Sequence, residues 1–339
     1  MRYDRVHIES LAHETPPIRL TSEELEERLA PCYSHYCLQP GFLFEHSGVK
    51  ARHLWDPGQT LSGAAAAAAT KALARTHLKP EDIGSLVMCS ISKELVEPAT
   101  AVLIHEKLGL PEESMAFDLT NACLGWMNGL TMVANQIELG QIKAGLVITA
   151  EDIGPVLQAT VPVLNERNDH RYFKKSFATL TMGSCAAAAV LTHESVSRTS
   201  HRLVGGHQMT FSKHNQLCRS SSLEEPVFTD VKGLLKNGLE SAEVCWHRFL
   251  DDFRWKPEEV GLSIFHQVSQ VHRDTMCRNL GLNPETNPMT LDEYGNVGSC
   301  SVPLTFSVAA EQGLARPGRK VSINAIGSGL VVMMMGVEW

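Results

Sequence analysis

The segment KPEDIGSLVMCS, residues 79–90, returns 177 positions later as KPEEVGLSIFHQ, residues 256–267. Each copy follows a helical pattern and contains an apolar strand pattern. The same offset carries AGLVITA, residues 144–150, onto VSINAIG, residues 321–327. A long-period repeat of helices and unbroken apolar strands is typical of duplicated α/β units, with parallel strands covered on both faces. We therefore expect two similar α/β halves.

An insert at residues 153–229 separates the repeated segments. It contains the charged stretch NERNDHRYFKKS, residues 165–176, and the polar stretch GGHQMTFSKHNQLCRSSS, residues 205–222. Polar insertions lie at the surface and often carry function. We expect this insert to lie over the functional site.

Composition limits the classes of function. The chain has 339 residues, of which 43% are hydrophobic and 20% are charged, as in ordinary globular proteins. A formal net charge of −8, without a basic tract, argues against nucleic acid as a partner. The longest apolar stretches are far too short to span a bilayer.

The cysteines indicate a reducing environment. Their odd number, nine, and the absence of a secretory pattern in MRYDRVHIES predict a cytoplasmic protein. Cys32 and Cys37 enclose His35, but no second ligand pair follows at the spacing of a zinc site. We therefore expect no metal.

The stretch DLTNACLGWMNGL, residues 118–130, contains the candidate nucleophile, Cys123. Residues 114–119 are predicted to form a short buried strand, and a helical stripe follows at Leu124, Met127, Leu130, Val133 and Ile137. Cys123 is thus expected at a helix start, where unpaired N–H groups and the helix dipole should hold its pKa below about 8.5. The small neighbours Ala122 and Gly125 are expected to leave room for a substrate. The alternative is a cysteine that only fills the core.

Two further polar residues follow apolar elements. His266 ends the strand pattern of the second repeat and precedes a helical pattern, whereas His272 lies inside that helix. Asn296 lies between Gly295 and Gly298, before a helix predicted to begin near Ser301. An amide held in such a turn can donate to an oxyanion, although both positions also suit purely structural roles.

Together these residues resemble a known family. Cys123 in NACLG, His266 in HQVS and Asn296 in YGNVG resemble the Cys–His–Asn set of ketosynthase III (beta-ketoacyl-ACP synthase III) type condensing enzymes of the thiolase superfamily. The resemblance spans the chain, including SGVKARHLW (47–55), ATLTMGSCAAAAVL (178–191) and NAIGSGL (324–330). It implies an α/β thiolase-like fold, in which two pseudo-symmetric βαβαβαββ halves form five α-β-α-β-α layers. Residues 1–175 would form the half with the cysteine, and residues 176–339 the half with His266 and Asn296.

The segment EPATA, residues 97–101, selects a branch of this family. Its Glu97, together with LAHETPP (11–17) and NQLCR (215–219), is most similar to the thiolases of olefin biosynthesis. That resemblance implies an acyltransferase (EC 2.3.1.-) that joins two fatty acyl-CoAs head to head, without decarboxylation, to give a β-keto acid for later lipid-pathway enzymes. Glu97 would be the general base, in a homodimer where it could serve Cys123 of the partner subunit. A surface carboxylate without a catalytic role is the alternative.

The substrates would be coenzyme A thioesters, with no separate cofactor. We predict Arg52, Trp55 and Arg219 as contacts of CoA, and Arg171, Lys174 and Lys175 are further available cations. Trp126, close to the nucleophile, could shorten or redirect an acyl tunnel.

The sequence is also compatible with three other functions. The first is a decarboxylative ketosynthase III that uses a malonyl thioester, against which Glu97 argues because its charge would repel the malonyl carboxylate. The others are a thiolase-fold subunit without catalytic activity and an acyl-CoA thioesterase.

Overall fold

The computed structural model describes residues 1–167, 169–222 and 225–339. Its two repeated segments form β4 (Ser85–Met88) and β11 (Val260–Phe265), and the second repeated pair forms β6 (Ala144–Glu151) and β12 (Lys320–Gly327). β4 pairs with β6 in parallel, and β11 pairs with β12 in parallel. The predicted repeat of α/β units is confirmed.

The strands that build the core follow the order β11-β12-β13-β8-β1-β7-β6-β4-β5. The remaining members are β1 (Val6–Glu14), β5 (Met115–Asp118), β7 (Cys185–His193), β8 (Arg202–Thr210) and β13 (Val331–Glu338). β1 and β8 meet at a single pair, His7 and Arg202, so two sheets join along one edge. β7 pairs with β1 and β6 in the first sheet.

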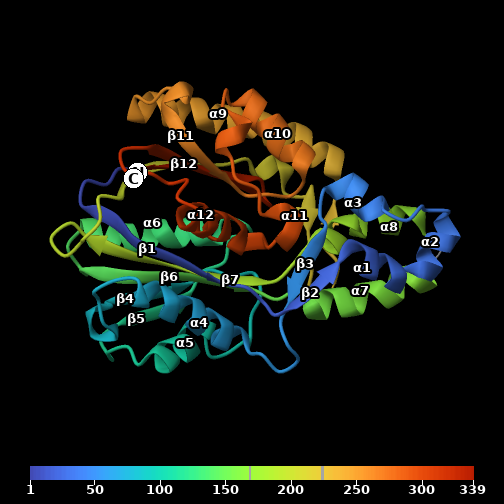
Figure 1. The fold of residues 1–339 in the computed structure, drawn as a ribbon, viewed down its shortest axis with the longest axis horizontal. Helices are drawn as coiled ribbons and strands as arrows, with labels where there is room; N and C mark the ends of the chain where they lie inside the picture. The colour runs from blue at the N-terminus through green and yellow to red at the C-terminus, as the bar shows by residue number, and fades with distance from the viewer. Residues whose placement is uncertain (168, 223–224) are drawn as a thin grey trace.

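Helices cover both sheets and fill the space between them, giving five layers in the order α-β-α-β-α (Figure 1). One outer layer holds α9 (Val231–Phe253) and α10 (Gln270–Asn279), at the top of Figure 1. The middle layer holds α6 (Gly125–Glu138) and α12 (Ser301–Glu311), and the other outer layer holds α4 (Leu61–Ala74) and α5 (Thr100–Leu108). The expected layered architecture is therefore confirmed.

The main hydrophobic core lies in the middle layer. The predicted stripe on α6 is fully buried there, with Trp126, against strands of both sheets and α12. Each large apolar side chain buried in this way stabilises the fold by about 1.5–3 kcal/mol. The alanines of α4 are also mostly buried, and their small size lets that helix pack closely on the first sheet.

The other elements form a lobe to the side of the two sheets (Figure 1, right). Its helices are α1 (Ser22–Arg28), α2 (Ala30–Tyr36), α3 (Phe42–Ser47), α7 (Gly154–Glu166) and α8 (His170–Ser176), which share an apolar cluster. Short strands accompany it: β2 (Ile18–Thr21) with β3 (Ala51–Leu54), and β9 (Cys218–Arg219) with β10 (Phe228–Thr229). The short helix α11 (Leu291–Tyr294) packs against β3.

One predicted strand lies in a different environment from the one expected. The predicted strand at residues 114–119 forms as β5 (Met115–Asp118), but β5 is the edge strand of the first sheet and Met115 is exposed. Within residues 1–167, 169–222 and 225–339, no helix is long and apolar enough to cross a membrane. The same residues contain no cluster of three or more His, Cys, Asp or Glu side chains suited to a metal ion.

Candidate active site

Cys123 lies in a tight turn between β5 and α6. The N–H groups of Leu124 and Gly125 donate to the carbonyls of Asn121 (3.0 Å) and Ala122 (3.1 Å). Ala122 has a φ of +47°, a left-handed conformation that a residue with a Cβ adopts at a cost. The chain therefore turns sharply at Ala122 and presents Cys123 just before the first helical residue.

The thiol of Cys123 differs from the sequence-based expectation. Burial, together with the smaller effects of the charges of Cys218 and Glu151, raises the pKa of Cys123 to about 12. The expected lowering of this pKa is wrong, because the neighbouring N–H groups already bond to carbonyls and desolvation opposes the thiolate. The resting residue is a thiol, so its use as a nucleophile requires a base.

The glycines near Cys123 allow close packing. A Cβ added to Gly125 would lie 2.7 Å from the carbonyl oxygen of Cys89, so this glycine lets α6 pack on the end of β4. A Cβ added to Gly327, at the end of β12, would lie 2.5 Å from the side chain of Leu124 and 3.6 Å from the backbone nitrogen of Cys123. Gly327 thus lets β12 approach the Cys123 turn.

His266 lies at the predicted corner, directly after β11 and before α10. Its backbone N–H donates to Asn324 of β12 (2.9 Å), three residues before Gly327, which places His266 at the same end of the second sheet as the Cys123 turn. Burial lowers the pKa of His266 to about 3, with the charge of His272 adding to the effect. Across the described residues, its Nδ1 is buried without a hydrogen-bond partner. The side chain is a neutral imidazole whose Nδ1 can form a further hydrogen bond.

Asn296 is fixed in the predicted glycine turn. Its side-chain oxygen accepts from the N–H of Gly298 (3.0 Å), which leaves the amide NH₂ as the donor end. Its backbone N–H donates to Thr181 (2.9 Å), and its carbonyl accepts from Gly183 (3.1 Å). The turn is held against the segment that enters β7, so the direction of the amide is set before a substrate arrives.

Glu151, the last residue of β6, was missed by the sequence analysis. It is buried, and its carboxylate accepts from the N–H groups of Ile91 and Ser92 (both 3.0 Å), from the Ser92 hydroxyl (2.7 Å) and from the Ser299 hydroxyl. It also lies close enough to Cys123 to affect the pKa of that thiol. Its only sequence signal was a carboxylate at the end of an otherwise apolar strand.

Glu97 lies away from these groups, on the exposed tip of the loop between β4 and α5. Val96 beside it is 94% exposed, and Leu95 is also largely exposed. Within this single chain the structure does not bring Glu97 to Cys123. Its proposed role as a base therefore depends on a second subunit.

The predicted CoA contacts are in three different environments. Arg52 is fully buried, and its guanidinium donates to Thr21 O (3.3 Å) and to the Ser22 hydroxyl (3.0 Å). The structure does not support Arg52 as a phosphate contact, because no ligand can reach it without unpacking the lobe. Trp55 is partly buried and donates to the carbonyl of Glu151 (3.1 Å).

Arg219 is the remaining candidate contact, and it is exposed. Its neighbour Cys218 is near enough to affect the pKa of Cys123. The short β9–β10 hairpin of the insert therefore lies close to the thiol, as expected for an insert over the site.

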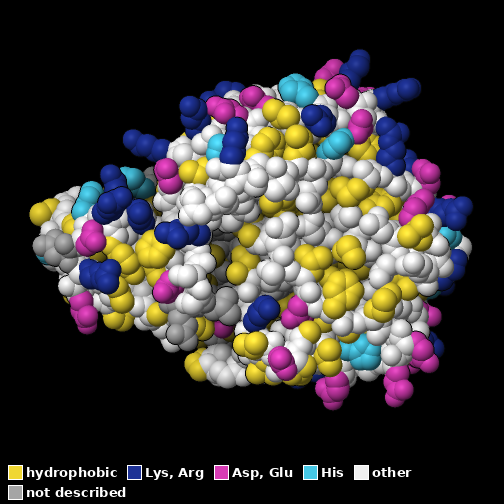
Figure 2. All heavy atoms as spheres, turned by 180° about the vertical axis from the view of Figure 1, so that it is seen from behind, with side chains coloured by type: hydrophobic (Ala, Val, Ile, Leu, Met, Phe, Trp, Pro, Cys, Tyr) yellow, Lys and Arg dark blue, Asp and Glu magenta, His cyan; other side chains and the backbone are white. Residues whose placement is uncertain are grey.

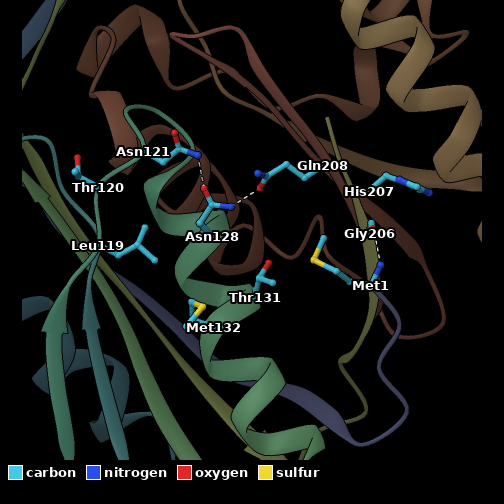
Figure 3. A pocket seen from close by; sticks show the side chains of 10 residues that line it. All are labelled: Met1, Leu119, Thr120, Asn121, Asn128, Thr131, Met132, Gly206, His207 and Gln208. Atoms are coloured by element: carbon cyan, nitrogen blue, oxygen red, sulfur yellow. Dashed lines mark hydrogen bonds between the residues drawn. The ribbon is translucent and has the colours of Figure 1, made fainter. Parts of the chain in front are cut away.

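A hollow of about 630 Å³ opens beside this turn (Figure 3). Its lining comes from the start of the chain, residues 119–121, α6 and β8, and comprises Met1, Leu119, Thr120, Asn121, Asn128, Thr131, Met132, Gly206, His207 and Gln208. Asn121 donates to Asn128 (2.7 Å), which in turn donates to Gln208 (Figure 3). The hollow begins two residues from Cys123, but its lining lacks Cys123, His266 and Asn296. It therefore flanks the candidate site and does not enclose it.

We predict that the raised pKa of Cys123 controls its alkylation. Because only the thiolate reacts, its rate with iodoacetamide should rise about tenfold per pH unit between pH 7 and pH 10. Site-resolved mass spectrometry measures this rate, with the exposed Cys37 as an internal reference. If the alkylation rate of Cys123 has already reached its plateau at pH 7, the residue is a thiolate at that pH. This result would contradict a neutral thiol and a neutral imidazole.

Comparison with known proteins gives a consistent result over the whole chain. Residues 59–216 match the thiolase N-terminal domain, and residues 250–339 match the C-terminal part of 3-oxoacyl-[acyl-carrier-protein (ACP)] synthase III. The chain is 38% identical, over 349 residues, to the acyl-CoA:acyl-CoA alkyltransferase of Shewanella oneidensis. It is 33% identical, over 340 residues, to the protein of the same name from Xanthomonas campestris pv. campestris. Both alignments cover 100% of this chain and 100% of the relative.

Solved structures of Xanthomonas campestris OleA agree closely with this fold. One variant of OleA matches with a TM-score of 0.97 at 33% identity, over 100% of this chain and 99% of that chain. A cysteine-to-serine variant of OleA, with lauric acid and lauroyl-CoA bound, matches with a TM-score of 0.96 at 33% identity. That match covers 99% of this chain and 100% of the other.

Proposed function

Because this chain belongs to the acyl-CoA:acyl-CoA alkyltransferases of the thiolase superfamily, we propose that it joins two fatty acyl-CoA molecules head to head. The product is a β-keto acid, and no carbon dioxide is lost in the condensation. The observation that carries this proposal is the similarity, over the full length of the chain, to two proteins named for that reaction. We propose the following roles for Cys123, His266, Asn296 and Glu97.

The first step is transfer of an acyl chain to Cys123. His266 assists removal of the thiol proton as the sulfur attacks the carbonyl carbon of the first acyl-CoA. His266 and the Asn296 amide donate hydrogen bonds to the oxygen that becomes negative in the tetrahedral intermediate. The carbon–sulfur bond to CoA then breaks, and CoA leaves with the proton. Cys123 is left as an acyl thioester.

The second step forms the new carbon–carbon bond. Glu97 takes a proton from the α-carbon of the second acyl-CoA, and the same donors hold the enolate oxygen. The α-carbon attacks the acyl carbonyl on Cys123, and the bond from that carbonyl to sulfur breaks. Cys123 is released and takes back a proton. Hydrolysis of the remaining CoA thioester gives the β-keto acid.

A homodimer would supply the setting that Glu97 lacks in one chain. The exposed apolar residues Leu95 and Val96 beside it are typical of a surface that another chain covers. On the face opposite to that of Figure 1, hydrophobic side chains gather toward the middle (Figure 2). We propose that the Leu95–Glu97 tip enters the partner subunit, where the loss of water would make the carboxylate a stronger base.

Mixed dimers test whether Glu97 acts across the interface. Cys123→Ala and Glu97→Ala chains, co-expressed with two affinity tags, give a heterodimer with one complete site if Glu97 serves Cys123 of the partner subunit. Its condensation rate should be about half that of the wild-type dimer, since one of two sites is complete. Homodimers of either variant are the controls. A heterodimer as inactive as these controls means that both residues act within one chain.

Trp55 and Arg219 remain proposed contacts of CoA, near the mouth of the site. Arg219 would meet a phosphate, and the β9–β10 hairpin brings it close to Cys123. CoA thioesters themselves are the substrates. No separate cofactor takes part in the proposed steps.

Product analysis tests the function. The purified protein is incubated with myristoyl-CoA, with and without malonyl-CoA, and released CoA and extracted lipids are measured. A β-keto acid, or the ketone derived from it, is expected from myristoyl-CoA alone. Product that appears only with malonyl-CoA indicates a decarboxylative ketosynthase, and free fatty acid alone indicates a thioesterase.

A further inference from the structure

The carboxylate of Glu151 has no place in the proposed steps, although it is only 6% exposed and lies beside the candidate nucleophile. Each of its oxygens accepts two hydrogen bonds. Oε1 accepts from the Ile91 N–H and the Ser299 hydroxyl, and Oε2 accepts from the N–H and the hydroxyl of Ser92. A buried carboxylate with every bond satisfied in this way is a rigid connection between its partners.

The partners of Glu151 belong to two different parts of the site. Ile91 and Ser92 begin the loop that carries Glu97, whereas Ser299 follows the turn that holds Asn296. A Cβ on Gly298 in that turn would lie 3.6 Å from the Glu151 side chain, so turn and carboxylate are in direct contact. One side chain therefore joins the loop of the proposed base to the turn of the proposed oxyanion donor.

The same loop is also held at its middle and its far end. Asp118 accepts from the N–H groups of Thr100 (3.0 Å) and Ala101 (2.8 Å), where the loop enters α5. Glu94 accepts from the N–H of Ser62 (2.7 Å) at the start of α4. The tip with Glu97 is exposed. The loop also reaches the Asn296 turn indirectly, since the Ser90 hydroxyl contacts Thr149 (3.4 Å) and Thr149 contacts Ser299, but Glu151 is the side chain that bonds to both segments.

We propose that Glu151 is a positioning residue, which sets the Glu97 loop and the Asn296 turn in fixed relation to each other. This inference rests on the proposed roles of Glu97 and Asn296. In a dimer, Glu151 would fix the position of Glu97, which reaches the active site of the partner subunit. It would also fix the position of Asn296, which acts in the active site of its own subunit. Condensation needs both groups in place, whereas acylation of Cys123 does not need Glu97.

The substitution Glu151→Gln tests this inference with little change in shape. In glutamine, an NH₂ group replaces one of the two carboxylate oxygens, and this group cannot accept a hydrogen bond. Because each oxygen of Glu151 accepts from two donors, the NH₂ group would face two donors, and the hydrogen bonds on that side of the residue would be lost. The substitution also removes a negative charge that, after burial and Cys218, raises the pKa of Cys123.

Glu9→Gln is the matched control. Glu9 is 7% exposed and accepts from the Thr192 hydroxyl (3.1 Å), the Ser197 hydroxyl (2.8 Å) and the Arg198 N–H (3.1 Å). Thr192 pairs with Ala144, the first residue of β6, whereas Glu151 is the last. The two buried carboxylates thus lie toward opposite ends of the first sheet.

For each protein we measure the rate of condensation and the rate of Cys123 acylation, together with the pH profile of Cys123 alkylation by iodoacetamide. For Glu151→Gln we expect condensation of myristoyl-CoA to fall about 10- to 100-fold, as for a misplaced catalytic group. Acylation of Cys123, which uses the Asn296 turn but not Glu97, should fall clearly less than condensation, and the alkylation profile should move to lower pH. Glu9→Gln should change none of these.

The inference is overturned if Glu151→Gln condenses at the wild-type rate, or if both rates fall together and the alkylation profile does not move. If Glu151→Gln does not fold, Ser92→Ala and Ser299→Ala must each slow condensation more than acylation, and equal losses overturn the inference. Wild-type protein that makes no β-keto acid from myristoyl-CoA would refute the proposed function instead. The alkylation profile would still report whether Glu151 acts on Cys123.

Discussion

Replacement of Cys123 by alanine is expected to abolish both release of CoA and formation of the β-keto acid, by at least about 10⁴-fold. Without the sulfur no acyl-enzyme can form at this position, and both half-reactions depend on that intermediate. Released CoA is measured with a thiol reagent, and the acyl-enzyme by intact-protein mass spectrometry.

The exposed Cys37 provides the control for this substitution. Cys37→Ala should keep the wild-type rates and still gain one acyl chain in mass. Cys123→Ala protein that retains more than about 1% of the condensation rate would assign the nucleophile to another residue.

Replacement of Glu97 by alanine is expected to separate the two half-reactions. Condensation should fall about 10³-fold, which is within the usual contribution of a general base. Acylation of Cys123 should continue, because His266 and not Glu97 assists removal of the thiol proton in that step. The acyl-enzyme should therefore accumulate, and intact-protein mass spectrometry detects it as the chain plus one acyl group.

Glu106→Ala is the matched control for Glu97, since Glu106 is also exposed and lies on the adjacent helix α5. It should leave both half-reactions unchanged. If Glu97→Ala condenses at the wild-type rate, Glu97 is a surface carboxylate, and the base is another group or is not needed.

The sequence predicted the parts of the fold that depend on local pattern. The repeat at residues 79 and 256 became β4 and β11, and the apolar stripe after Cys123 became the buried face of α6. His266 and Asn296 also lie in the predicted corner and turn. In each case the signal lies within a few neighbouring residues, where spacing and turn chemistry decide the structure.

The features that were not predicted depend on residues far apart in the chain. Glu151 bonds to residues 60 and 148 positions away, so its role has no local pattern. The raised pKa of Cys123 and the burial of Arg52 arise from packing of separate elements, which outweighs the local helix-start effect. The spacing of the apolar residues predicts where Cys123 lies in the chain, but it does not predict how strongly the surrounding elements desolvate its thiol.

The most direct test of head-to-head condensation follows the carboxyl carbons of the substrate. The protein is given myristoyl-CoA labelled with ¹³C at the carbonyl carbon as its only acyl donor, and the freshly formed acid is analysed by mass spectrometry. Head-to-head condensation predicts a β-keto acid that keeps both ¹³C labels, one in the ketone and one in the carboxyl group. A product formed only after malonyl-CoA is added, and carrying a single label, would contradict it.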